Sequence, residues 1–187
     1  MLAPVVKEVT ELLGDYVYGV DVESLESVCS QLLRQKHWTM ATAESCTGGQ
    51  VAQRLTALPG ASQVYRGGAV SYWTQVKADV LGVPQALLEE YGAVSAEAAR
   101  AMAEGARRIT GADIAVSVTG VAGPDPDERG VDVGIVYIGL AAPEGTFCRR
   151  CDFGKRRRDR IRDLAANHSF DVVRRYLTGL PVETWTK

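Results

Sequence analysis

Thr42-Ala-Glu-Ser-Cys-Thr-Gly-Gly49 is the stretch that decides the fold, because it joins two different periodic patterns. Residues 38–43 form a short, mostly apolar run that is typical of a buried strand. Residues 50–57 carry apolar side chains at helical spacing. We therefore predict a tight strand-to-helix turn over residues 44–49, with the open backbone N–H groups of a helix N-terminus beside it.

Two residues of this turn, Ser45 and Thr47, add hydroxyl groups at the same place. A nucleophile beside open backbone N–H groups is the arrangement that acyl chemistry requires, because those groups stabilise a developing oxyanion. The alternative is a plain helix N-cap followed by two glycines that allow close packing. Short Ser/Gly motifs match by chance, so the stretch taken alone favours this structural alternative.

The composition is that of an ordinary globular domain: 187 residues, 46% hydrophobic and 24% charged. A net charge of −2 gives no general attraction to nucleic acid or to a membrane surface, so neither is an expected partner. No apolar run reaches transmembrane length, and the first residues do not resemble a signal peptide. Four cysteines lack metal-ligand spacing and the density of a disulfide scaffold, so we expect reduced thiols and a cytoplasmic location.

Periodicity and turn residues divide the rest of the chain into alternating helices and strands. We predict a separate N-terminal piece over residues 1–20, with a short helix to about Leu13, and one domain over residues 21–187 in which Asp21 caps the first helix. Domain helices are expected at 21–35, 50–57, 74–81, 85–91, 95–109 and 158–177, and strands at 38–43, 62–72, 112–119, 131–141 and 146–153. Because a hairpin follows the alternating part, we predict a three-layer α/β/α sandwich with a mixed central sheet.

A second glycine-rich loop, Gly120-Val-Ala-Gly-Pro-Asp125, follows the predicted strand at 112–119. In α/β folds, ligands bind beyond the carboxyl ends of the strands. We therefore predict that this loop and the Gly48–Gly49 turn meet at one edge of the sheet. Another glycine pair, Gly67–Gly68, indicates a bulge or a close backbone approach in its strand.

Few side chains in this sequence can deprotonate a serine. The two histidines, His37 and His168, lie at a strand entry and on the last helix, and we expect both to be structural. Lys77 is the other candidate base, but it acts as one only if burial lowers its pKa and leaves it neutral. A solvated helix lysine is the commoner state of such a residue. We find no metal-binding constellation in the sequence.

The stretch Lys155-Arg-Arg-Arg-Asp-Arg-Ile-Arg162 is short, contains an aspartate and belongs to an acidic chain, so it does not indicate a polyanion-binding surface. Arg158 and Arg162 share a helix face at a spacing of four residues. One or two arginines that hold a small phosphate fit this pattern better, and a solvated helix face is the alternative.

Several of these residues occur in the order and spacing of a known family. The shared stretches are Ala43-Glu-Ser-Cys-Thr-Gly-Gly49, Tyr72 with Lys77 five residues on, Gly92-Ala-Val-Ser95, Thr119-Gly-Val-Ala-Gly-Pro-Asp125 and Val133-Gly134. They resemble the C-terminal domain of the competence/damage-inducible protein CinA and its stand-alone form, nicotinamide mononucleotide deamidase (PncC). The resemblance covers about residues 21–177, and residues 13–19 resemble the segment that precedes this domain in full-length CinA.

The resemblance implies hydrolysis of the carboxamide of nicotinamide mononucleotide to nicotinate mononucleotide and ammonia, without a metal or other cofactor. It implies that Ser45 is the nucleophile, Lys77 its base and Tyr72 a helper. Residues of the two glycine loops would line the substrate site: Thr47, Gly48, Gly49, Thr119, Gly120, Ala122 and Gly123. The resemblance also implies a homo-oligomer, which we expect to be a dimer.

The phosphate-binding arginine depends on how the motif is counted. The family places an arginine after a Phe-x-Gly, followed by a second arginine four residues later. Counting from Phe153 gives Arg157, whereas the Arg-x-x-Ile-Arg pattern gives Arg158 with Arg162. We predict that Arg158 contacts the phosphate.

The chain departs from the family pattern at two places. Trp73-Thr74 stands where Ser-Asn is common, and Val133-Gly134-Ile135 stands where Val-Gly-Thr is usual. Trp73 would reshape the pocket wall, which bears on the substrate more than on the fold. Two alternatives therefore stay open: a catalytically silent nucleotide-binding or assembly module that serves a partner domain, and an amidase that uses Cys46 as its nucleophile.

Overall fold

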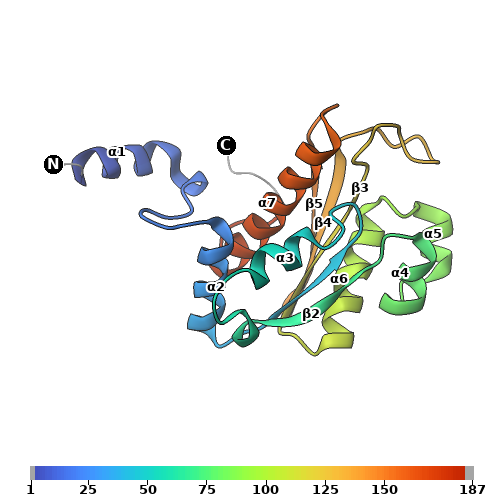
Figure 1. Cartoon of the computed structure of the whole chain (residues 1–187), viewed down its shortest axis with the longest axis horizontal. Helices are drawn as coiled ribbons and strands as arrows, with labels where there is room; N and C mark the ends of the chain where they lie inside the picture. The colour runs from blue at the N-terminus through green and yellow to red at the C-terminus, as the bar shows by residue number, and fades with distance from the viewer. Residues whose placement is uncertain (1–2, 184–187) are drawn as a thin grey trace.

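The computed structural model describes residues 3–183 and consists of a five-stranded sheet with helices on both faces (Figure 1). The strands are β1 (Met40–Glu44), β2 (Tyr65–Val70), β3 (Ile114–Gly120), β4 (Ile135–Ala142) and β5 (Gly145–Asp152). The α-helices are α1 (Ala3–Leu13), α2 (Leu25–Lys36), α3 (Gln50–Thr56), α4 (Thr74–Leu81), α5 (Gln85–Tyr91), α6 (Ala96–Thr110) and α7 (Arg158–Leu177). The predicted α/β/α sandwich is confirmed.

The strands are arranged in the order β2-β1-β3-β4-β5, so the chain extends the sheet first to one side of β1 and then to the other, and β1 is the topological switch point. The three parallel strands lie with β2 on one side of β1 and β3 on the other, while β4 pairs antiparallel with β3 and β5 pairs antiparallel with β4. The carboxyl ends of β1 and β3 are adjacent, because Glu44 pairs with Val118 and the Ser45 N–H donates to the Val118 carbonyl at 2.9 Å. Both glycine loops leave from these ends, so the prediction that they meet at one edge is confirmed.

Two apolar layers hold the sheet between its helices. One is formed with α2, α3 and α7 and contains large side chains such as Phe170. The other is formed with α4, α5 and α6 and is rich in alanine beside Met102 and Leu81. Small residues allow α6 to lie close to the sheet: a Cβ at Gly139 would lie 2.4 Å from the Ala99 carbonyl oxygen. Helix α6 therefore packs closely against the sheet.

The first domain helix begins later than predicted. Ser24 is its N-cap, because Ser24 Oγ accepts from the Ser27 N–H and Ser27 Oγ accepts from the Ser24 N–H, each at 3.2 Å. Asp21 instead has a φ of 54°, which is a turn conformation and not the extended backbone of an N-cap. The prediction for Asp21 was wrong because the serine pair satisfies two N–H groups at once.

The second strand is shorter than predicted, since a 3₁₀ turn, η2 (Ala61–Gln63), precedes it. It ends at Val70, which leaves Tyr72 beyond the sheet. The register shifts between the pairs Met40–Tyr65 and Ala41–Gly67, and a Cβ at Gly68 would lie 2.3 Å from the Thr42 carbonyl oxygen. The irregularity lies at Arg66, next to the glycine pair, and the predicted close backbone approach is confirmed at Gly68.

The fourth strand is also shorter than predicted, because residues 131–134 belong to the preceding loop. The Asp127 carboxylate accepts from the Val131 N–H at 2.8 Å, and Gly134 has a φ of 98°. These features close the loop on itself before β4 begins at Ile135. The following β4–β5 hairpin is present as predicted.

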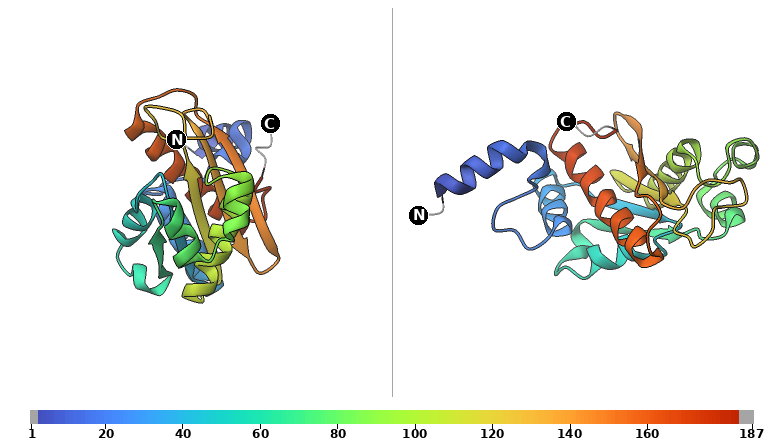
Figure 2. Two further views of the ribbon diagram at one scale, coloured as in Figure 1. Left: turned by 90° about the vertical axis from the view of Figure 1, so that its right-hand side faces the viewer. Right: turned by 90° about the horizontal axis from the view of Figure 1, so that it is seen from above.

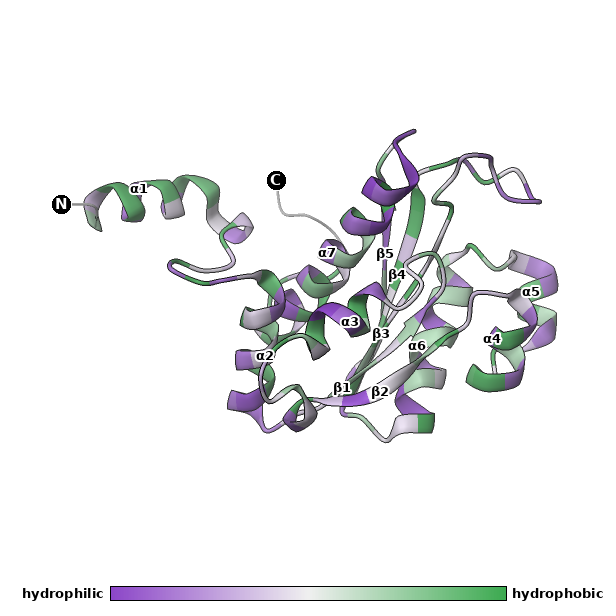
Figure 3. Ribbon diagram, viewed as in Figure 1, coloured by the Kyte–Doolittle hydropathy of each residue, from purple (hydrophilic) through white to green (hydrophobic). Residues whose placement is uncertain are grey.

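The N-terminal helix α1 extends away from the domain and buries none of its residues (Figures 1 and 2). Hydrophobic residues occur along it, among them Val5, Val9 and Leu12 (Figure 3). Its base is tied to α7, because the Asp15 carboxylate pairs with Arg175 at 3.3 Å. The predicted homodimer, which offers a surface to cover these residues, stays a prediction.

The longest helix, α7, has 20 residues and carries charges along its length. Within residues 3–183, no helix combines the length and the apolar character needed to cross a bilayer. All four cysteines are buried and none forms a disulfide.

Candidate active site

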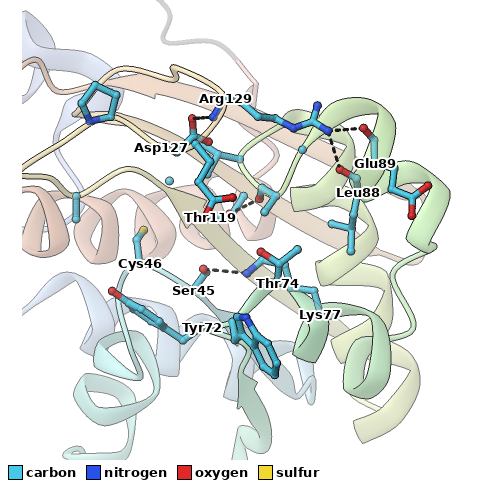
Figure 4. A pocket seen from close by; sticks show the side chains of 18 of the residues that line it. Ser45, Cys46, Tyr72, Thr74, Lys77, Leu88, Glu89, Thr119, Asp127 and Arg129 are labelled. Atoms are coloured by element: carbon cyan, nitrogen blue, oxygen red, sulfur yellow. Dashed lines mark hydrogen bonds between the residues drawn. The ribbon is translucent and has the colours of Figure 1, made fainter.

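Ser45 and Lys77 form a hydrogen-bonded pair at the carboxyl end of β1 (Figure 4). Lys77 Nζ lies 3.0 Å from Ser45 Oγ and donates to the Ser71 carbonyl oxygen at 2.7 Å. Ser45 is 9% exposed and Lys77 only 1%. The lysine is therefore a buried neighbour of the serine and not a solvated helix residue.

The burial of Lys77 changes its protonation. Removal of the ammonium group from water lowers the pKa of Lys77 from 10.5 to about 8, and the nearby Cys46 acts weakly in the opposite direction. No carboxylate in residues 3–183 pairs with Lys77 to restore its usual pKa. About a tenth of the molecules then hold a neutral Lys77 at pH 7, and the neutral amine can accept the Ser45 proton.

Local structure after β2 places the lysine. The Ser71 N–H donates to the Glu44 carbonyl at 2.8 Å, which continues the pairing of β1 and β2 by one residue. The Ser71 carbonyl is thereby presented to Lys77 in the first turn of α4, which begins at Thr74. The base thus follows directly from the end of the strand beside the one that carries the nucleophile.

The N-terminus of α3 is not open, contrary to the prediction. The carboxylate of Glu44, which is 1% exposed, accepts from the N–H groups of Gly49 and Val51 at 3.0 Å and of Ala52 at 2.8 Å. The Gly48 N–H donates to the Ser45 carbonyl. Within the described residues, the N–H groups of Cys46 and Thr47 donate to no backbone carbonyl or carboxylate. Thr47 is fully buried, whereas Cys46 lines the cavity, so the Cys46 N–H is the oxyanion donor that this turn offers.

A cavity of about 630 Å³ opens at the Ser45–Lys77 pair (Figure 4). Both glycine loops contribute to its wall, and so do the β2–α4 connection, α5 and residues 126–129. Of the predicted site residues, the cavity is lined by Ser45, Lys77, Tyr72, Thr119, Gly120, Ala122 and Arg158.

Four of the predicted binding residues do not line the cavity: Thr47, Gly48, Gly49 and Gly123. The Glu44 contacts draw the turn toward the sheet, so Thr47 is fully buried and Gly49 becomes the N-cap of α3, with a φ of 96°. Gly123 contacts a residue of the cavity wall without lining the cavity itself, because its carbonyl accepts from Arg158 Nη1 at 2.6 Å.

Arg158 faces the cavity, whereas Arg157 does not. Arg158 Nη2 donates to the hydroxyl of Tyr72, and its other terminal nitrogen holds the second glycine loop. Arg157 pairs with the exposed Asp159 at 2.8 Å. Arg162 turns to the first loop and donates to the Thr47 carbonyl at 2.7 Å. The phosphate contact of Arg158 stays a prediction.

Tyr72 is 56% exposed, and its hydroxyl group meets Arg158. No hydrogen bond joins it to Ser45 or Lys77 among the described residues. The role as a helper that the resemblance implies would therefore act through the arginine in this conformation.

Sequence reasoning missed one wall of the cavity. Arg129 donates to the carbonyl groups of Leu88, Glu89 and Glu90 at the C-terminal end of α5 (Figure 4). These contacts fasten the loop between β3 and β4 over the cavity. The only signal in the sequence was a polar loop containing an arginine, which does not reveal its acceptors.

The other possible nucleophile, Cys46, and the two histidines are poorly suited to amide hydrolysis. Burial raises the pKa of the Cys46 thiol to about 12, so Cys46 stays protonated and is a weak nucleophile. His37 ends α2 with a φ of 56°, and His168 packs edge-on against Phe153 with ring centroids 5.0 Å apart. Neither histidine lines the cavity, and both are structural as predicted.

Fold and site together define an α/β-sandwich protein with a buried serine–lysine pair at the end of a central strand. The family model described as the CinA C-terminal domain matches residues 22–177. The chain therefore belongs to the CinA family of competence/damage-inducible proteins.

The curated relatives that share this domain are longer than this chain. A CinA-like protein of Frankia casuarinae is 49% identical over 181 residues, which are 97% of this chain and 41% of that protein. A CinA-like protein of Desulfotalea psychrophila is 46% identical over 165 residues, which are 88% of this chain and 40% of that protein. The chain thus spans less than half the length of the curated relatives it matches.

Solved structures confirm the fold. The competence/damage inducible protein CihA of Agrobacterium tumefaciens is similar with a TM-score of 0.77 and 32% identity, over 86% of this chain and 99% of that one. The competence damage-inducible protein A of Klebsiella pneumoniae has a TM-score of 0.80 and 30% identity, over 82% of this chain and 95% of that one.

Proposed function

We propose that this chain hydrolyses the carboxamide of nicotinamide mononucleotide to nicotinate mononucleotide and ammonia. The observation that carries the proposal is the 3.0 Å contact between Lys77 Nζ and Ser45 Oγ at the wall of a cavity. The cavity volume of about 630 Å³ lies within the range of about 300–1,000 Å³ that is usual for small-molecule sites.

Acylation begins when neutral Lys77 accepts the proton of Ser45 Oγ, while Oγ forms a bond to the carboxamide carbon. The carbonyl oxygen becomes an oxyanion, and the N–H group of Cys46, which lines the cavity, is the donor left to receive it. The C–N bond then breaks, and protonated Lys77 returns the proton to the departing nitrogen. Ammonia leaves, and the acyl group stays on Ser45 as an ester.

Deacylation repeats these steps with water as the nucleophile. Lys77, now neutral, accepts a proton from the water that attacks the ester carbon. When the tetrahedral intermediate collapses, Ser45 Oγ leaves and regains the proton from Lys77. Nicotinate mononucleotide is released and the pair returns to its starting state.

Recognition of the phosphate requires a side chain, because the Glu44 carboxylate already fills the amides at the start of α3. We assign this role to Arg158, which lines the cavity and is held by Gly123 and Tyr72. Glu89 and Asp127 also line the cavity, and their negative charges complement the positive pyridinium ring.

The second candidate is a catalytically silent nucleotide-binding or assembly module. It is favoured by the Trp73-Thr74 departure and by relatives in which the matched region is less than half of a longer protein. A buried lysine that desolvation brings to a pKa of about 8 is costly to keep without a chemical use, which supports the hydrolase.

Ammonia release from nicotinamide mononucleotide distinguishes the two candidates. The purified chain is incubated with the nucleotide, ammonia is measured by a coupled assay, and nicotinate mononucleotide is identified by chromatography. Nicotinamide without the ribose phosphate is the matched control substrate, and Ser45→Ala is the control protein. Binding of the nucleotide without any ammonia release would support the silent module instead.

A further inference from the structure

Glu44 is a buried carboxylate that no cation accompanies. Its exposure is 1%, and within residues 3–183 no arginine, lysine or histidine pairs with it. Both carboxylate oxygens are instead taken by three backbone N–H groups at the start of α3. A buried charge is costly unless it is satisfied, and these amides together with the helix dipole satisfy it.

The origin of this carboxylate separates it from an ordinary helix cap. A capping side chain usually comes from the N-cap residue itself, but here Gly49 occupies that position and has no side chain to offer. The acceptor comes from five residues earlier, on the other side of the nucleophile. The hydrogen bonds from the Gly49, Val51 and Ala52 N–H groups to the Glu44 carboxylate therefore close a loop of the main chain that contains Ser45.

The backbone of Glu44 also reaches the base. Its carbonyl accepts from the Ser71 N–H at 2.8 Å, and the Ser71 carbonyl accepts from Lys77 Nζ at 2.7 Å. The main chain of one residue thus fixes the segment that holds Lys77, while its side chain fixes the turn that holds Ser45. Substituting the side chain tests the second link and leaves the first in place.

We propose that Glu44 is a positioning residue whose carboxylate holds the 45–49 turn so that Ser45 Oγ meets Lys77 and the Cys46 amide stays open to the cavity. The same contacts remove the α3 amides from competition for the oxyanion. This role deepens the proposed hydrolase function and rests on it for the turnover that is measured. It requires no contact between Glu44 and the substrate.

Replacement of Glu44 by glutamine removes the charge and one acceptor while keeping the shape. The amide NH₂ then faces backbone N–H groups, so at least one of the three bonds is lost. We expect kcat for nicotinamide mononucleotide to fall about 100-fold, because small displacements of a nucleophile are costly, with KM within about threefold. The rate at which a fluorophosphonate labels Ser45 at fixed pH falls in parallel, and this readout needs no turnover.

Ser24→Ala is the matched control, because it removes the cap of α2, which does not line the cavity. This variant lowers the melting temperature but leaves kcat and the labelling rate within about twofold. If Glu44→Gln behaves like Ser24→Ala, with a lower melting temperature and normal labelling, Glu44 is only a helix cap and the proposal is overturned.

Glu44→Asp decides the matter if the glutamine variant does not fold. It keeps the charge on a shorter side chain, so labelling of Ser45 falls about tenfold if the length of the side chain matters, and an unchanged rate overturns the proposal.

Failure of the proposed hydrolase function gives a different result. The wild-type chain then releases no ammonia, yet its Ser45 is labelled rapidly and the Glu44 variants are labelled slowly. No labelling of wild-type Ser45 would overturn the positioning role itself.

Discussion

The buried end of the cavity, at Ser45 and Lys77, differs from its rim, at Tyr72 and Trp73, in exposure to solvent and in hydrogen bonding. Lys77 is 1% exposed and Ser45 9%, whereas Tyr72 is 56% and Trp73 73% exposed. The buried pair is joined by a hydrogen bond at 3.0 Å and is tied to the sheet through Ser71. At the rim, the indole of Trp73 makes no ring contact or hydrogen bond within residues 3–183.

In the proposed hydrolysis, this difference separates the chemical step from substrate recognition. A lysine becomes a base only where water is excluded, so the reacting pair has to be buried and fixed. Side chains that contact a soluble nucleotide have to be reachable from solvent, so they lie at the rim and retain freedom. Substitutions at the buried pair should therefore lower kcat, while substitutions at the rim should change KM.

The largest effect is expected at the buried pair. Ser45→Ala and Lys77→Met should each lower kcat by about 10⁴-fold or more, because serine and base act as one unit. Lys77→Met should also stabilise the fold, since a pKa lowered to about 8 corresponds to about 3 kcal/mol of destabilisation at neutral pH. Ammonia release and thermal melting measure the two effects. Cys46→Ala is the control; loss of turnover there, with turnover kept in Ser45→Ala, would indicate a thiol amidase.

The pH dependence follows from the same lysine. The neutral form is the base, so kcat/KM should rise about tenfold per pH unit up to about pH 8 and then level off. The lowered folded pKa also means that the unfolded chain binds more protons between about 8 and 10.5, so stability from this group rises over that window. The stability difference between wild type and Lys77→Met should therefore shrink above pH 8. A flat rate profile from pH 6 to 9 would argue against Lys77 as the base.

Arg158 should show the next largest effect, on KM. Arg158→Lys keeps the charge but loses the planar fork that holds a phosphate, so KM should rise about tenfold with little change in kcat. Steady-state kinetics with Arg157→Lys as the control tests this, because Arg157 pairs with Asp159 away from the cavity. Harm from Arg157→Lys alone would move the phosphate contact by one residue, and silence of both would make the stretch a solvated face.

The Tyr72 hydroxyl contacts Arg158, so its removal tests whether Tyr72 acts in substrate binding or in the chemical step. Tyr72→Phe removes the hydroxyl that holds Arg158, so we expect KM to rise about threefold while kcat stays nearly constant. Kinetics with Tyr72→Phe at saturating and limiting substrate measures both terms. A large fall in kcat at unchanged KM would instead assign the hydroxyl to proton transfer at the Ser45–Lys77 pair.

The smallest effect is expected at Trp73. An aromatic ring at the rim can stack on the pyridinium, which is worth about 1 kcal/mol at exposed positions, so Trp73→Ser should raise KM up to about fivefold. Trp73→Phe retains a ring and should lie closer to wild type. The melting temperature should not change, because the side chain is 73% exposed. A lower KM in Trp73→Ser would mean that the indole obstructs the nucleotide.

Most elements of the fold were predictable from the sequence, and the errors share a cause. Apolar periodicity located the five strands and the domain helices, because buried faces repeat at the spacing of the element. The starts of α2, β2 and β4 were displaced, because each depends on local polar contacts such as the Ser24–Ser27 pair and the Asp127–Val131 bond. Patterns of hydrophobicity do not record which polar group finds which partner.

By itself, the sequence determined the α/β/α architecture, the turn at Ser45 and the short set of groups able to act as nucleophile and base. Only the tertiary structure decided which of these groups are buried and which of their hydrogen-bonding positions are occupied. Lys77 is buried and its pKa is lowered because α4 packs it against the sheet away from water, and the amides of α3 are occupied because the Glu44 carboxylate accepts from them. Periodicity is a property of neighbours along the chain, whereas desolvation and hydrogen-bond occupancy depend on residues far apart in sequence that meet only when the sheet forms.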